Sequence, residues 1–184
     1  AGGSAGEIGG SVWRSTFASY ADRVGPFSLE QPLVARGRVA FTGADPDSGV
    51  SLGWFNSVAK GTGEHQLRDF VGVHVEGPTR VGHYFQPMIV TAAGNKASPG
   101  KGPVLPPDSK PHAWTFAYDP AANEGNGAVT VTLDQESVTL NIAKARRAEG
   151  AQLDRFGLFS AAVGGSRVKI YLDDIEYSAA PPKR

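Results

Sequence analysis

The chain has 184 residues, of which 40% are hydrophobic, and it contains 24 glycines and 13 prolines. Its 18 lysines and arginines balance 18 aspartates and glutamates, so it lacks the positive field that attracts nucleic acid or an anionic membrane. Cysteine is absent, which excludes disulfides, thiol nucleophiles and thiolate metal sites. No apolar run approaches the roughly 18 residues of a membrane span. We therefore expect neither a nucleic-acid partner nor membrane insertion.

The length predicts one domain, flanked by two short segments. Residues 1–10 are rich in glycine, alanine and serine, which favours a flexible, processed or excised N-terminal segment. We expect the domain to cover residues 11–178 and a C-terminal tail to cover 179–184.

Short apolar or alternating runs separated by turn residues predict strands along most of this domain. The expected strands cover residues 35–41, 49–56, 70–76, 83–90, 114–118, 128–133, 137–142, 155–160 and 167–177. Residues 93–111, rich in Gly, Pro, Lys and Ser, predict an exposed loop. A short helix is expected at 20–24 or 144–149. Many strands at short spacing favour an all-β, antiparallel two-sheet β-sandwich of the jelly-roll kind.

Two of these segments have a clear inward face. In the 70–76 strand, Val71, Val73 and Val75 point to one side and His74 and Glu76 to the other, because side chains alternate across a sheet. In the 128–142 hairpin, alternating valines and leucines mirror each other across a turn at 134–136. We expect Val138 and Leu140 to be buried with Val129 and Val131, and the threonines to face solvent.

Compact catalytic and metal motifs are missing. The Gly2-Gly3-Ser4-Ala5-Gly6 run has the G-x-S-x-G pattern but follows no strand, so we interpret it as a linker. No phosphate-binding loop occurs, and the histidines are not spaced as zinc ligands. Asp173 and Asp174 lie in the last predicted strand, where a structural calcium or ordinary solvation and capping could offset their charge. Apart from this candidate calcium, the sequence indicates no required cofactor.

Polar and aromatic residues two apart in the predicted strands are expected on one sheet face, opposite the valine core. These residues, which we call the predicted patch, are Arg36, Arg38, Trp54, Asn56, His74, Glu76, Arg80, His83, Tyr84 and Gln86. Such a face suits sugars, whose apolar ring faces stack on aromatics and whose hydroxyls bind planar polar groups. An ordinary solvated face of an antiparallel sheet explains the same pattern, and the two interpretations stay open.

Several phrases resemble the concanavalin A-like lectin and glucanase superfamily, particularly jelly-roll modules of large extracellular bacterial proteins. They lie at residues 52–57, 72–85, 112–114, 118–120, 154–159 and 171–177. The resemblance implies a jelly roll whose concave sheet binds carbohydrate, with calcium near the final strand at Asp173 or Asp174. The glucanase pattern E-x-D-x-E is absent, so the resemblance does not extend to a retaining glycosidase with both carboxylates on one strand.

The leading hypothesis is therefore a carbohydrate-recognition module whose predicted patch binds a polysaccharide or oligosaccharide. We expect it to be secreted or periplasmic and to be part of a larger extracellular protein or assembly. One alternative is a lyase that moves protons with Tyr84 or a histidine, or a hydrolase that uses Glu76. A second alternative is a structural or adhesion domain. The binding hypothesis requires Trp54 to be partly exposed.

Overall fold

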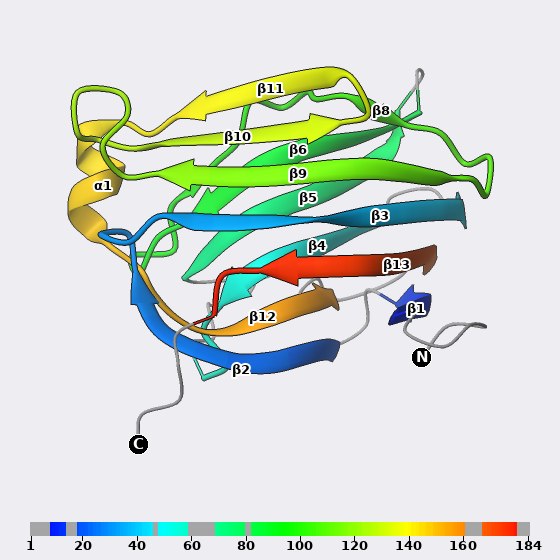
Figure 1. Ribbon diagram of the computed structural model, residues 1–184, viewed down its shortest axis with the longest axis horizontal. Helices are drawn as coiled ribbons and strands as arrows, with labels where there is room; N and C mark the ends of the chain where they lie inside the picture. The colour runs from blue at the N-terminus through cyan, green and yellow to red at the C-terminus, as the bar shows by residue number, and fades with distance from the viewer. Residues whose placement is uncertain are drawn as a thin grey trace.

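Two antiparallel sheets pack face to face in the computed structural model, which describes residues 8–13, 18–45, 48–58, 69–79, 82–160 and 167–179 (Figure 1). Sheet A has the order β1 (Ile8–Trp13), β13 (Arg167–Tyr177), β3 (Leu33–Ala44), β9 (Pro111–Asp119), β10 (Ala128–Leu133), β11 (Glu136–Asn141). Sheet B has the order β2 (Ala18–Ser28), β12 (Gln152–Ser160), β4 (Ser48–Phe55), β5 (Phe70–Thr79), β6 (Gly82–Val90), β7 (Lys96–Ala97), and β8 (Val104–Leu105) also pairs with β6. The predicted all-β, two-sheet antiparallel sandwich is confirmed.

The single described helix, α1 (Lys144–Glu149), is one of the two helices expected from the sequence. The other expectation, a helix at residues 20–24, is wrong, because these residues lie within strand β2 and pair with β12. Strand β1 begins at Ile8, inside the segment that the sequence assigned to the flexible start. Strand β1 lies beside the last strand, β13, and pairs Ile8 with Leu172. The described residues include no helix with the length and apolarity needed to cross a bilayer.

The core between the sheets follows the alternation seen in the sequence. Sheet B contributes Val71, Val73 and Val75, each at most 3% exposed. Sheet A contributes Val129 and Val131, which are fully buried. Burial of this kind contributes about 1.5 to 3 kcal/mol for each large apolar side chain. The alternation therefore identifies the inward face of both strands.

The predicted hairpin of β10 and β11 is present, with Val131 paired to Val138. Val138 and Leu140 were expected to be buried, but they are only half-buried, because β11 is the edge strand of sheet A. On the opposite face, the hydroxyls of Thr130 and Thr139 lie 2.9 Å apart.

A second apolar cluster lies on the outer face of sheet B, opposite the main core. Its members are at most 4% exposed: Phe55, Phe70, Met88, Val90 and Phe159. The rings of Phe55 and Phe159 are 4.6 Å apart, and those of Phe70 and Phe159 are 5.3 Å apart. This end of the outer face is therefore covered and is not an ordinary solvated surface.

Candidate functional site

The residues of the predicted patch do not share one face. Arg36 and Arg38 lie on the exposed side of β3 in sheet A. His74, Tyr84 and Gln86 lie on the outer face of sheet B. The two sets are therefore on opposite sides of the sandwich. Alternation assigns residues to a face of their own strand, but it does not say which sheet the strand joins.

Trp54 is in the core, so its predicted exposure was wrong. It is 0% exposed and points inward with Val50 and Leu52. Its indole contacts the ring of Phe156 at 4.7 Å between centroids, and its Nε1–H donates to the carbonyl oxygen of Ser178 at 3.0 Å. Trp54 cannot stack on a ligand from this position.

His83 also points inward, contrary to expectation. It is 5% exposed and its ring lies 4.2 Å from that of Phe41, and burial lowers its pKa. Asn56 lies just beyond β4, where its Oδ1 accepts a hydrogen bond from the backbone N–H of Val58 at 3.0 Å. Arg80 and the side chain of Glu76 are outside the described residues, so their assignment to the patch stays a prediction.

The outer face of sheet B holds a row of polar side chains across three strands, which we call the polar row: Ser51 on β4, His74 on β5 and Gln86 on β6. Ser51 Oγ is 3.0 Å from His74 Nδ1. Gln86 is 2% exposed, and its Oε1 accepts a hydrogen bond from Ser98 Oγ at 3.3 Å. Tyr84 follows on the same face of β6, two residues from Gln86.

The imidazole of His74 lies against the backbone of the neighbouring strand because residue 49 is glycine. A Cβ on Gly49 would lie 3.1 Å from His74 Cε1 and 3.2 Å from Nε2. Ser51 then orients the ring through Nδ1. Ser51 was not predicted as a site residue, although its position between the inward Val50 and Leu52 was the signal that it shares a face with His74.

The arginines on sheet A are paired with carboxylates of the last strand. Arg36 Nη2 is 2.7 Å from Glu176 Oε2, and Arg38 Nε is 3.3 Å from Asp174 Oδ2. All four side chains are more than half exposed, so each pair contributes at most about 1 kcal/mol. The Arg36 pair borders a shallow cavity of about 480 Å³ together with Val34 and Thr115.

The predicted calcium ligands have other partners. Asp174 faces Arg38, and Asp173 Oδ1 accepts a hydrogen bond from the Asp174 N–H at 2.9 Å. Within the part of the chain that the structure describes, no three His, Cys, Asp or Glu residues gather as metal ligands would. Calcium at Asp173 or Asp174 therefore stays a prediction that chelation can test.

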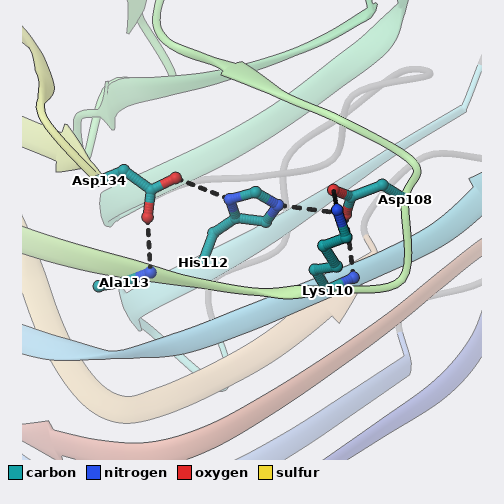
Figure 2. Close-up of polar contacts among 5 residues, drawn as sticks. All are labelled: Asp108, Lys110, His112, Ala113 and Asp134. Atoms are coloured by element: carbon teal, nitrogen blue, oxygen red, sulfur yellow. Dashed lines mark hydrogen bonds and ion pairs between the residues drawn. The ribbon is translucent and has the colours of Figure 1, made fainter.

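One charged cluster was not anticipated from the sequence (Figure 2). His112, at the start of β9, lies between two carboxylates: Nδ1 is 2.7 Å from Asp134 Oδ2, and Nε2 is 3.2 Å from Asp108 Oδ1. Asp134 Oδ1 also accepts the Ala113 N–H, and Asp108 Oδ1 accepts the Lys110 N–H. The cluster therefore connects the β10–β11 turn and the loop of residues 106–110 to β9.

We expect this cluster to make stability depend on pH. Burial lowers the pKa of His112, but the hydrogen bonds and charges of Asp134 and Asp108 outweigh it and raise the pKa. The stability that the imidazolium contributes is present below its unfolded pKa, about 6.5, and is lost as the pH rises through the higher folded value. The denaturant concentration at the unfolding midpoint should fall as the pH rises from about 6.5 through the folded pKa of His112 in the wild type, but not in His112→Gln. An equal fall in both proteins would assign the pH dependence to other groups.

The comparisons with known proteins identify the fold. No family model matches the chain, and no curated protein is significantly similar to it. Alginate lyase vAL-1 from Chlorella virus superposes with a TM-score of 0.54 at 10% identity, over 92% of this chain and 84% of that one. A congerin II double mutant superposes with a TM-score of 0.49 at 13% identity, over 88% of this chain and 100% of that one.

An alginate lyase from Pseudomonas aeruginosa gives a TM-score of 0.48 at 10% identity, over 83% of this chain. The chain spans 66% of that enzyme, slightly less than two thirds of its length. At such identities the likeness concerns the fold alone. The likeness to vAL-1 supports the jelly-roll fold that the sequence resemblance implied.

Proposed function

We propose that the protein recognises a polysaccharide or oligosaccharide on the outer face of sheet B. The observation that carries this proposal is the polar row, in which Ser51, His74 and Gln86 lie side by side on the outer face of sheet B, with the half-buried His74 as the member that a ligand can reach. The jelly roll shared with alginate lyase vAL-1 supports a carbohydrate ligand. On this proposal the protein acts where polysaccharides occur, secreted or in the periplasm.

The chemistry of the polar row suits sugar hydroxyls, which both donate and accept hydrogen bonds. Hydroxyl, imidazole and amide groups also do both. The ring of His74 is already oriented by Ser51, and Gln86 is held by Ser98, so little rotamer freedom is lost when a ligand binds. The half-buried ring of Tyr84 adds an apolar surface beside the row.

The test is a binding screen of the full chain against neutral and acidic polysaccharides, followed by His74→Ala on the ligand that binds. We expect about a tenfold loss of affinity, because one or two hydrogen bonds of about 1 kcal/mol each disappear. Arg36→Ala is the matched control, since Arg36 lies on the opposite sheet, and it should bind like the wild type. Thermal denaturation should show that both variants are folded.

A loss on Arg36→Ala with no effect of His74→Ala would place the ligand on sheet A and refute the proposed site. If no polysaccharide in the screen binds, the structural or adhesion alternative replaces the proposal.

The second candidate function is a polysaccharide lyase on the same face. It is favoured by the position of His74 and Tyr84 on adjacent strands with the same outward direction. In a β-elimination, one of these groups removes the proton at the α-carbon of a uronate and the other protonates the leaving oxygen. Incubation with alginate and other uronate polymers would reveal the unsaturated product by its ultraviolet absorbance, and Tyr84→Phe should abolish it. A reducing-sugar assay tests the hydrolase alternative that uses Glu76.

A further inference from the structure

A separate cleft opens between the two sheets at the edge formed by β1 and β2. Its volume is about 380 Å³, within the range of sites for small molecules. Its inner wall is apolar and is made by core residues that include Leu52 and Leu172. At its mouth, Ile8 and Tyr20 are among the few large apolar side chains that are exposed, at 36% and 54%. The cleft is not on the outer face of sheet B, so it is independent of the polar row.

Three aromatic side chains and one carboxylate line this cleft: Tyr20, Phe156, Tyr177 and Asp22. The rings of Phe156 and Tyr177 are stacked, with centroids 4.0 Å apart and planes 15° from parallel. The Tyr177 hydroxyl donates a hydrogen bond to Asp22 Oδ2, which joins the last strand of sheet A to the edge strand of sheet B. Asp22 is therefore held at the cleft by a residue of the opposite sheet.

The charge of the cleft has one sign. Asp22 is the only charged residue among its described lining residues, and none of these is basic. The neighbouring Arg23 lies opposite Arg155 in the β2–β12 register, so its side chain belongs to the other face of β2. Burial and the bond to Asp22 raise the pKa of Tyr177 to about 12, so the phenol stays neutral and donates to the carboxylate.

An inward carboxylate can also protect an edge strand from pairing with another chain. Edge protection requires only the charge, and it does not account for a cleft with aromatic rings on its walls. Aromatic faces together with one negative charge attract organic cations, because the ring quadrupole and the carboxylate act in the same direction. Methylated ammonium groups suit such a site best, since their apolar methyls also favour the leucine wall.

We infer that the cleft between β1 and β2 binds a small organic ammonium ion, with Asp22 as its counter-charge, Tyr20 and Tyr177 as its aromatic surface, and the buried Phe156 as the ring that holds Tyr177 in place.

The test uses choline as the probe and 3,3-dimethyl-1-butanol, its uncharged isostere, as the control ligand. Titration of the full chain, followed by calorimetry or by chemical-shift changes, should show choline binding at least about tenfold tighter than the isostere, since desolvated cation–aromatic contacts favour the cation. Asp22→Asn keeps an acceptor for Tyr177 and should remove most of this preference. His74→Ala, which alters only the outer face of sheet B, should bind choline like the wild type.

Absence of choline binding to the wild type overturns the inference. Equal binding of the two ligands also overturns it, because the site would then be merely apolar. An unchanged affinity of Asp22→Asn for choline would show that Asp22 is not the counter-charge and would overturn the inference. Because polysaccharide binding is tested on different residues, failure of this inference is distinguishable from failure of the proposed function.

Discussion

Replacing Trp54 by alanine is expected to lower the free energy of unfolding by about 3 to 5 kcal/mol, a large share of the stability of a typical domain. The side chain is fully buried between the sheets, where it contacts Phe156 and Phe116. Truncation leaves a cavity that rigid strands on both sides cannot fill. It also leaves the Ser178 carbonyl without its indole donor. Urea denaturation followed by circular dichroism measures the loss.

Trp54→Phe is the matched control, because it keeps an aromatic ring in the core and removes only the N–H donor and part of the volume. We expect it to cost less than half as much as the alanine variant. If Trp54→Ala instead kept its denaturation midpoint while losing polysaccharide binding, Trp54 would be exposed and the assigned direction of β4 would be reversed.

Gly72→Ala is the second variant with a large expected effect, about 3 kcal/mol or more, since the clash involves backbone atoms that cannot move independently. A Cβ at this position would lie 2.7 Å from Phe70 Cζ and 2.8 Å from Gly53 Cα, and closer still to the Leu52 carbonyl oxygen. The strands β4 and β5 would have to separate to accommodate it. We expect either failure to fold or a strongly lowered midpoint in chemical denaturation.

Gly49→Ala is the control on the same face of the adjacent strand. The atoms nearest to its Cβ would be those of the His74 imidazole, at 3.1 to 3.2 Å, and the Val75 carbonyl oxygen, at 3.4 Å. A side chain can shift by a few tenths of an ångström, so we expect a loss below about 1.5 kcal/mol. Similar losses in the two variants would contradict the packing argument for Gly72.

The fold was largely predictable because alternation is a local property. Val71, Val73 and Val75 identify an inward face without knowledge of the neighbouring strands. The same local argument failed for β2, where Asp22, Arg23, Gly25 and Pro26 interrupt any period, although pairing with β12 stabilises the strand. Such pairing is a long-range interaction that no short window of sequence contains.

The site was less predictable because it depends on which sheet each strand joins. The sequence placed Arg36 beside His74, but β3 pairs with β9 and β13, whereas β5 pairs with β4 and β6. Trp54 was assigned to the wrong face because it was grouped with Asn56 instead of with Val50 and Leu52. Phe55 is also buried, as a member of the second apolar cluster. Because both faces of β4 carry hydrophobic residues, the sequence did not show which face of this strand points into the core.

The pairing of β1 with β13 has a mechanical consequence. These strands are antiparallel, so the N-terminal end of β1 and the C-terminal end of β13 lie at the same end of the pair, where Ile8 faces Leu172. A pulling force transmitted through the residues before β1 and after β13 would load their hydrogen bonds one at a time. This peeling geometry resists less force than shearing all the bonds together. Tension would therefore detach β1 first, and with it one wall of the cleft between the sheets.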